Sequence, residues 1–533
     1  MDNRFCAMLD VSRNGVLTVE KVKEFISVIA KMGYNALMLY TEDTYEVKNE
    51  PLFGYLRGAY TSDEIKEIDA YSIKHGVELM PCIQTLAHLN GIFRWHEYAK
   101  INDTDDILLV GDERTHQLIE NMFLTLKENF SSRTVLVGLD EAHMVGRGKY
   151  MDINGCQARY DVMCKHLETV SKIASKYGFE LLMWSDMFVR LANGGEYYAD
   201  EPIPESVAKR IPKNTVPVYW DYYHVQEKEY EKFFDLHGAF DEVWFAGGTW
   251  CWCGFVPCLN FALSTTSAAM NVCRKRKVKN IIMTLWGDDG RECSCFTSLP
   301  VLYYAIETYK GNNDVEKIKK GFKQITGEDF DAFMALECPN FYNASESGID
   351  NPTKYMLYND PFFGQFDFNV IGGERDFYND VVKKLTCAQK KSRAYKYVFK
   401  FERDLCSVLS VKCDLGVRTR KAYQENNVDA LRDIVNDYSL TIKRVRKFLG
   451  SFEELWENEN KLNGFEVQQI RIGGLIQRLL YCKKKILKYL DGKIVSIPEL
   501  ETVLIDAYGL KNKKETGFAA LSHWALSATV NIL

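Results

Sequence analysis

The chain has 533 residues, of which 46% are hydrophobic and 26% are charged, and this is the composition of an ordinary globular protein. The net charge of −6 disfavours a nucleic-acid partner, because nucleic acids select basic surfaces. No stretch reaches the ~18 apolar residues that a membrane span needs, so we expect no membrane partner. The length allows two or three domains, or one barrel with an appended region.

The start of the chain and its cysteines indicate the cellular compartment in which the protein is expected. From Met1 the sequence enters a short apolar run, without the basic segment and long apolar core of a signal peptide. The 15 cysteines are an odd number spread through a large chain, which is typical of reduced thiols. We therefore expect a cytoplasmic protein.

Strand-like apolar runs alternate with amphipathic helices through the first part of the chain. Strands are expected at residues 5–13, 35–43, 77–84, 134–141, 179–186, 215–223, 241–247 and 280–289, with helices at 19–31, 61–74, 115–129, 158–177, 259–273 and 301–309. This alternation predicts an α/β fold, a (β/α)₈ TIM barrel. A doubly wound open sheet is the alternative, but it needs a glycine-rich turn where this chain has Asp10-Val11-Ser12-Arg13.

The pattern changes after about residue 312, where the strands stop. Long amphipathic helices follow, for example at 376–398, 427–448 and 467–490. We therefore predict a catalytic barrel over 1–330 and a mainly α-helical C-terminal domain over 331–533. A helical domain of this kind is a candidate surface for a homodimer.

The run from Thr134 to Glu141 is the most informative stretch. Apolar residues lead through Gly138 to two adjacent acids, Asp140 and Glu141. The carboxyl ends of the strands form the catalytic face of a TIM barrel. Because adjacent side chains on a strand point to opposite faces, the two acids should approach a pocket at different angles.

Several motifs in order resemble glycoside hydrolase family 20, the β-N-acetylhexosaminidases. Met8-Leu9-Asp10-Val11-Ser12-Arg13 resembles the family's opening strand, Val137-Gly138-Leu139-Asp140-Glu141 its Gly-Gly-Asp-Glu signature, and Leu285-Trp286-Gly287-Asp288 its final Trp-Gly-Glu. The likeness covers roughly residues 5 to 310. It implies a retaining mechanism in which the substrate's own 2-acetamido oxygen attacks the anomeric carbon.

The resemblance assigns roles to individual residues. Glu141 matches the general acid, and Asp140 matches the residue that orients the acetamido N–H. Acids and an arginine match positions that hold sugar hydroxyls, and three tryptophans match the indoles around the acetamido methyl group. The substrate-binding residues implied are Arg13, Glu42, Asp43, His88, Trp184, Trp220, Tyr222, Trp250, Trp286 and Asp288.

The chain also departs from the family pattern. Leu139 stands at the second glycine of the signature, and Cys82 and Gln84 replace an acidic third strand. The family tyrosine that hydrogen-bonds the acetamido oxygen has no clear counterpart, and Tyr222 and Trp250 are the two candidates at the pocket. We expect the small domain that usually precedes the family barrel to be absent, and we therefore expect a divergent branch of the family.

The resemblance implies an exo-β-N-acetylhexosaminidase that removes terminal non-reducing GlcNAc and GalNAc from a glycan or glycoconjugate. Two alternatives stay open: release of a disaccharide such as lacto-N-biose, and an inactive sugar-binding protein, against which the intact Asp140 and Glu141 argue. No cofactor is implied. We expect no metal, because the C-x-C spacings at Cys251 and Cys293 do not match zinc sites.

Overall fold

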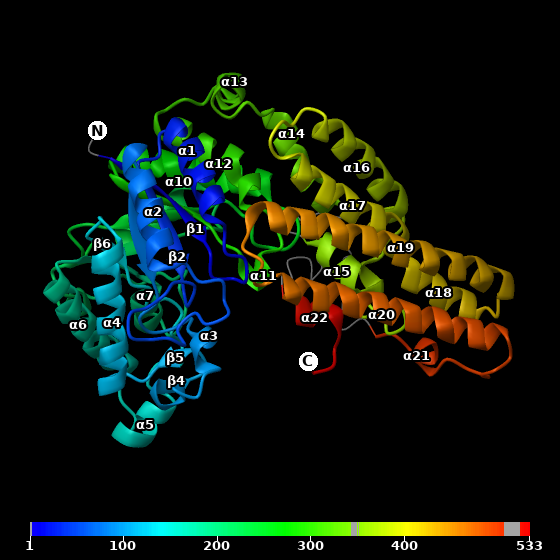
Figure 1. The fold of residues 1–533 in the computed structure, drawn as a ribbon, viewed down its shortest axis with the longest axis horizontal. Helices are drawn as coiled ribbons and strands as arrows, with labels where there is room; N and C mark the ends of the chain where they lie inside the picture. Colours follow the sequence, from blue (N-terminus) through cyan, green and yellow to red (C-terminus); the bar gives the residue numbers. More distant parts are fainter. Residues whose placement is uncertain (1–2, 343–348, 350, 506–522, 533) are drawn as a thin grey trace.

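The structure is a computed structural model that describes residues 3–342, 349, 351–505 and 523–532. In this part of the chain eight strands close into a parallel barrel in the order β1-β10-β9-β8-β7-β6-β3-β2 (Figure 1). The barrel strands are β1 (Arg4–Asp10), β2 (Ala36–Thr41), β3 (Glu78–Ile83), β6 (Thr134–Leu136), β7 (Glu180–Trp184), β8 (Thr215–Trp220), β9 (Trp244–Gly248) and β10 (Asn280–Leu285).

The barrel interior is a packed core and not a channel. Met8 on β1 pairs with Met38 on β2, and Met38 pairs with Met80 on β3. All three side chains are fully buried in one interior cluster that also contains Leu182 and Trp184. This layer forms a floor beneath the carboxyl ends of the strands.

Amphipathic helices surround the barrel because each buries one apolar face on the sheet. α1 illustrates the local signals: the Thr18 side chain accepts the N–H of Lys21 at its start, and Gly33 ends it at a φ of 110°. The larger barrel helices are α1 (Val19–Met32), α2 (Ser62–Lys74), α4 (Glu113–Asn129), α6 (Arg159–Tyr177), α9 (Glu227–Leu236), α10 (Leu259–Arg276) and α12 (Leu299–Tyr309).

Short elements occupy the connections between barrel strands and helices. They are α3 (Asn90–Phe93), η1 (Ala99–Ile101), the hairpin strands β4 (Asn102–Thr104) and β5 (Ile107–Leu108), α5 (Lys149–Asn154), α7 (Asp186–Ala192), α8 (Glu205–Ala208), α11 (Asp288–Arg291) and η2 (Cys295–Ser298). Among them, α11 directly follows β10 and lies where the barrel meets the C-terminal helices (Figure 1).

The C-terminal part of the chain is helical and lies beside the barrel (Figure 1). Its elements are α13 (Val315–Thr326), α14 (Phe330–Met334), η3 (Ala335–Phe341), α15 (Pro352–Tyr358), η4 (Asp367–Asn369), α16 (Glu374–Gln389), α17 (Lys396–Lys412), α18 (Leu415–Gln424), α19 (Val428–Glu459), α20 (Phe465–Leu490), α21 (Pro498–Glu501) and α22 (Trp524–Ala528). None of the helices in the described ranges is both long and apolar enough to cross a bilayer.

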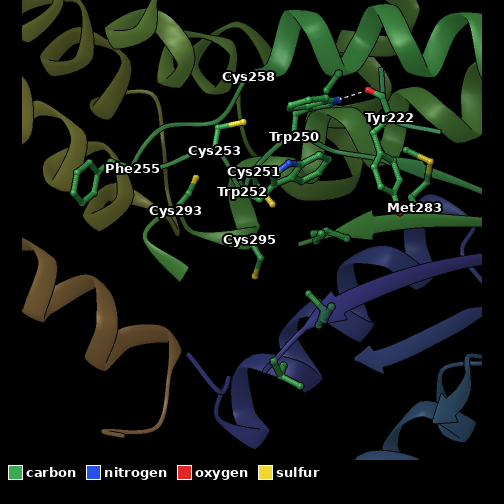
Figure 2. Close-up of a cluster of buried hydrophobic side chains, with 14 of the residues drawn as sticks. Tyr222, Trp250, Cys251, Trp252, Cys253, Phe255, Cys258, Met283, Cys293 and Cys295 are labelled. Atoms are coloured by element: carbon green, nitrogen blue, oxygen red, sulfur yellow. Dashed lines mark hydrogen bonds between the residues drawn. The ribbon is translucent and has the colours of Figure 1, made fainter. Parts of the chain in front are cut away.

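An aromatic contact joins the two parts. Phe255, in the loop that follows β9, is fully buried and extends toward the C-terminal helices (Figure 2). Its ring centroid lies 5.7 Å from that of Phe448 on α19 and 6.2 Å from that of Phe401 on α17. The loop after β9, at the carboxyl end of the barrel, is therefore held by the helical part of the chain.

The predicted TIM barrel followed by a helical region is confirmed, with two local corrections. The strand predicted at 134–141 ends at Leu136, because Gly138, Leu139 and Glu141 adopt positive φ values of 77°, 74° and 51°. The helix predicted at 376–398 is two helices, α16 and α17. Glu328 accepts backbone N–H groups from the connection between them. The domain boundary between residues 330 and 331 remains a prediction.

Candidate active site

A cavity of about 620 Å³ opens at the carboxyl ends of the barrel strands. Most of the residues that the sequence pointed to line it: Arg13, Glu42, His88, Asp140, Glu141, Trp184, Trp220, Tyr222, Trp286 and Asp288. Its volume lies within the ~300–1,000 Å³ of ordinary small-molecule sites. Aromatic and charged side chains occur together there, which suits a ligand with apolar faces and hydroxyl edges.

The turn that carries the two acids depends on Gly138. A Cβ atom at this residue would lie 1.9 Å from Oε1 of Gln84 and would displace that side chain, and the φ of 77° also favours glycine. The close approach allows Gln84 Nε2 to donate a hydrogen bond of 2.9 Å to Oδ1 of Asp140. The glycine of the signature therefore serves to hold Asp140.

The same turn contains backbone strain at two residues that are not glycine. Leu139 and Glu141 both have positive φ, which costs of order 1–3 kcal/mol each. Asp186, the first residue of α7, compensates by accepting the backbone N–H of Glu141 at 3.0 Å. Burial, with the charge of Asp140, raises the pKa of Asp186 above its ordinary value.

Asp140 is a buried carboxylate with a cationic neighbour. Its Oδ2 atom lies 3.3 Å from Nε2 of His88. Burial disfavours both charges, but the pairing overrides it: the Asp140 charge raises the pKa of His88 to about 10, and His88 with the Gln84 hydrogen bond lowers the pKa of Asp140. Asp140 is therefore ionised at neutral pH.

Glu141 has a more open environment than its neighbour. Its side chain is 47% exposed, against 11% for Asp140, and its Oε2 atom lies 3.8 Å from Nε2 of His88. The carboxyl group thus borders the cavity and is accessible to a ligand, whereas Asp140 is held in place beneath it. The two adjacent acids have different environments and can perform different tasks.

A polar cluster forms another part of the cavity wall. Arg13, after β1, pairs through Nε with Glu42 at 3.0 Å and through Nη1 with Asp288 at 2.9 Å. Burial raises the pKa of Asp288 to about 6 even though Arg13 acts in the opposite direction. Tyr40 donates its hydroxyl to Glu42 at 3.2 Å. This cluster offers donors and acceptors of the kind that bind vicinal hydroxyl groups.

Aromatic rings form the remaining wall. The Trp184 and Trp286 ring centroids are 6.1 Å apart, and Trp220 stacks on Tyr222 at 5.1 Å. Burial raises the pKa of Tyr222 well above its ordinary value, although hydrogen bonds with the Trp286 and Thr284 side chains act against it. Tyr222 and Trp286 both line the cavity as parts of this aromatic wall.

Two residues implied by the resemblance do not line the cavity. Asp43 is 1% exposed and is held by Arg57 Nε at 3.0 Å. Trp250 is 2% exposed, and its indole donates to the backbone oxygen of Tyr222 at 2.7 Å (Figure 2). Trp252 stacks on Trp250 at 4.7 Å and borders the cavity in its place. Glu42 therefore faces the cavity in place of Asp43, and Trp252 faces it in place of Trp250.

The cavity also includes residues that the sequence reasoning did not single out: Asn90, Tyr223, Trp252, Asp289 and His523. Asp289 and Tyr223 directly follow the predicted residues Asp288 and Tyr222, so their positions in the sequence could have indicated that they line the cavity. His523 had no such signal, because it comes from the far end of the chain. In the described ranges no group of three or more His, Cys, Asp or Glu side chains has the arrangement of a metal site.

Comparison with known proteins identifies similar sequences for both parts of the chain. Residues 6–232 match the glycosyl hydrolase family 20 catalytic domain, and residues 328–519 match the glycoside hydrolase 20C C-terminal domain. Hexosaminidase D from Bos taurus is 23% identical over 246 residues, covering 43% of this chain and 65% of the relative. Hexosaminidase D from Homo sapiens is 22% identical over 213 residues, covering 38% of this chain and 42% of the relative.

The solved structures that this chain matches share little sequence identity with it. The exo-β-N-acetylglucosaminidase from Vibrio harveyi, in complex with N-acetylglucosamine, is 15% identical with a TM-score of 0.47, covering 63% of this chain and 58% of that one. The β-N-acetylhexosaminidase from Streptomyces coelicolor A3(2) is 17% identical with a TM-score of 0.45, covering 61% and 69%.

Proposed function

The chain belongs to glycoside hydrolase family 20, and from this membership we propose that it is an exo-β-N-acetylhexosaminidase. Its substrate is a glycan or glycoconjugate with a terminal, non-reducing, β-linked GlcNAc or GalNAc. The observation that carries the proposal is the unequal pair of adjacent acids: Asp140 is buried and paired with His88, while Glu141 is accessible from the cavity.

In the proposed first step Glu141 donates a proton to the glycosidic oxygen, and the C1–O bond breaks. The carbonyl oxygen of the substrate's acetamido group forms a bond to C1 from the opposite face, which gives a cyclic oxazolinium intermediate. The leaving alcohol departs neutral. The exposure of the Glu141 side chain suits contact with a leaving group of variable size.

The carboxylate of Asp140 assists by accepting the acetamido N–H, because positive charge develops on this group as its oxygen attacks. A carboxylate has about four acceptor sites, so the hydrogen bond from Gln84 and the contact with His88 leave room for the substrate. The lowered pKa of Asp140 keeps it ionised for this task. His88 and Gln84 are thus positioning residues for Asp140.

In the second step the Glu141 carboxylate takes a proton from water, whose oxygen attacks C1 and reopens the ring with net retention. Trp184, Trp220 and Trp286 enclose the acetamido methyl group. We assign the hydrogen bond to the acetamido oxygen to Tyr222, because Tyr222 lines the cavity, whereas Trp250 lies outside it and donates its indole N–H to the Tyr222 backbone. Arg13, Glu42 and Asp288 bind the hydroxyl groups remote from the scissile bond.

We further propose that the protein acts in the cytoplasm without a cofactor, which accords with thiols rather than disulfides at Cys251, Cys253, Cys293 and Cys295. A homodimer through the helical domain also remains a proposal.

The proposed enzymatic activity is tested by assaying aryl β-glycosides of GlcNAc, GalNAc, lacto-N-biose and glucose side by side. Release from the first two supports the proposal, release from lacto-N-biose alone indicates a disaccharide-releasing enzyme, and no release from any indicates a sugar-binding protein.

A further inference from the structure

The turn after β10 connects the cavity to the C-terminal helices. Asp289, Gly290 and Arg291 have φ values of 48°, 104° and 53°, so three successive residues adopt left-handed backbone. Two non-glycine residues in this conformation are strained and need external support. Gln468 on α20 supplies part of it by donating to the Gly290 backbone oxygen at 3.0 Å.

The carboxylate of Asp289 is the centre of a charged network in this turn. Lys354 on α15 is fully buried and contacts Asp289 at 2.6 Å and Glu292 at 2.8 Å. Arg471 on α20 contacts the same two carboxylates at 3.0 and 3.2 Å. Two acids near the cavity are therefore neutralised by two cations from the helical domain.

The last described segment of the chain is attached to this network. The backbone N–H of Trp524 donates to Oδ2 of Asp289 at 2.5 Å, and the Arg471 guanidinium lies 5.1 Å from the centroid of its ring. Gln365 Nε2 donates to the backbone oxygens of Leu526 and Ser527 at 2.8 and 3.2 Å. Figure 1 places α22 next to α20 and close to α11. The segment is held at several points.

This attachment places His523 at a defined part of the cavity wall. His523 directly precedes Trp524 and lines the cavity together with Asp289. Asp289 in turn follows Asp288, which belongs to the polar cluster with Arg13. His523 therefore lies on the hydroxyl-binding side, where O3, O4 and O6 of the sugar would point away from the leaving group.

We propose that His523 blocks extension of the bound sugar at its non-reducing end and so restricts the enzyme to a single terminal N-acetylhexosamine. A galactose attached to O3 or O4 would have to occupy the space that His523 and its anchored segment take. The helical domain thus determines substrate length, in addition to supporting the barrel. This inference rests on the proposed function, because it uses the assignment of Asp288 to the sugar hydroxyls.

The test compares mono- and disaccharides in the full-length protein and its variants His523→Ala and Trp524→Ala. One readout is kcat/KM for 4-nitrophenyl β-glycosides of GlcNAc, lacto-N-biose and N-acetyllactosamine. The other is Kd for GlcNAc and lacto-N-biose from the intrinsic tryptophan fluorescence, which needs no turnover. We expect the wild type to prefer the monosaccharide at least about 100-fold, and His523→Ala to raise the disaccharide-to-monosaccharide ratio at least about fivefold in both readouts.

Leu526→Ala is the matched control. Its side chain is 58% exposed on the same segment, and the ratio should stay at the wild-type value. Ratios unchanged within twofold in both His523→Ala and Trp524→Ala, with normal thermal unfolding, would overturn the inference, as would a wild type that accepts the disaccharide equally well. If the wild type hydrolyses no glycoside, the proposed function fails, and the Kd ratio alone then supports or overturns the role of His523.

Discussion

His88 Nε2 lies 3.3 Å from Asp140 Oδ2, so one member of the adjacent acid pair has a cationic partner within the protein. The second member, Glu141, borders the cavity with about half of its side chain exposed. The two acids therefore differ in burial and in charge environment, although they are neighbours in the chain. The positive φ at Glu141, and not strand alternation, directs them to different places.

The His88–Asp140 pair predicts a specific pH dependence of stability. The folded pKa of His88, about 10, is above its ordinary value of 6.5, so the stabilisation is full below pH 6.5 and is lost as the pH rises through 10. The lowered pKa of Asp140 has the opposite sign: its contribution is present above the ordinary value of 3.8 and is lost as the pH falls. The free energies of unfolding of wild type and His88→Gln should therefore differ most between pH 3.8 and pH 6.5.

Urea unfolding at several pH values measures this difference. We expect the gap in free energy of unfolding to shrink from pH 6.5 towards pH 10, by at most about 1.4 kcal/mol per pH unit. The exposed His75, replaced in His75→Gln, controls for the loss of a histidine as such. A gap between wild type and His88→Gln that is constant across this range would show that the pairing does not exist in solution.

Glu141→Gln should lower turnover of natural glycosides by at least ~10²-fold, because a glutamine cannot protonate the leaving oxygen. Aryl glycosides with acidic phenols should be partly spared in the glycosylation step, since such leaving groups need little protonation. Glu205→Gln, at a side chain that is 78% exposed, should retain wild-type rates. Near-normal hydrolysis of chitobiose by Glu141→Gln would exclude Glu141 as the general acid.

If the acetamido group is the nucleophile, an N-acetylglucosamine thiazoline should inhibit competitively, because it resembles the cyclic intermediate. Plain β-glucosides, which lack this group, should be very poor substrates. The burial and pairing of Asp140 motivate this expectation, since a carboxylate held in this way is poorly placed to attack C1 itself. Isolation of a sugar ester on an Asp or Glu side chain would contradict it.

The sequence predicted the barrel because apolar periodicity and helix-ending glycines are local signals. It also predicted which strand ends carry acids and indoles. It could not decide between Glu42 and Asp43, because one residue of register determines which of them faces the cavity and which binds Arg57. His523 was beyond prediction for another reason: its place depends on tertiary contacts of Trp524 with Asp289 and Arg471.

Lys354→Met should destabilise the protein by about 3 kcal/mol, because it leaves Asp289 and Glu292 buried with only Arg471 to neutralise them. Urea unfolding at neutral pH gives the measurement. Lys383→Met removes an equivalent charge from an ion pair on the surface and should leave the unfolding midpoint almost unchanged. Similar midpoints for the two variants would mean that the network does not support the turn.

The enzyme should hydrolyse aryl β-glycosides of GlcNAc and GalNAc with kcat/KM values within about tenfold, or ~1.4 kcal/mol. The two sugars differ only in the orientation of O4, which the cluster of Arg13, Glu42 and Asp288 would read. The Asp288 side chain is 40% exposed and shorter than the glutamate that the family has there, so water can bridge to either epimer. The indoles around the acetamido group meet the same group in both sugars and add no preference. A preference of a thousandfold or more, ~4 kcal/mol, would require a dry, rigid site for O4 and would contradict this account of Asp288.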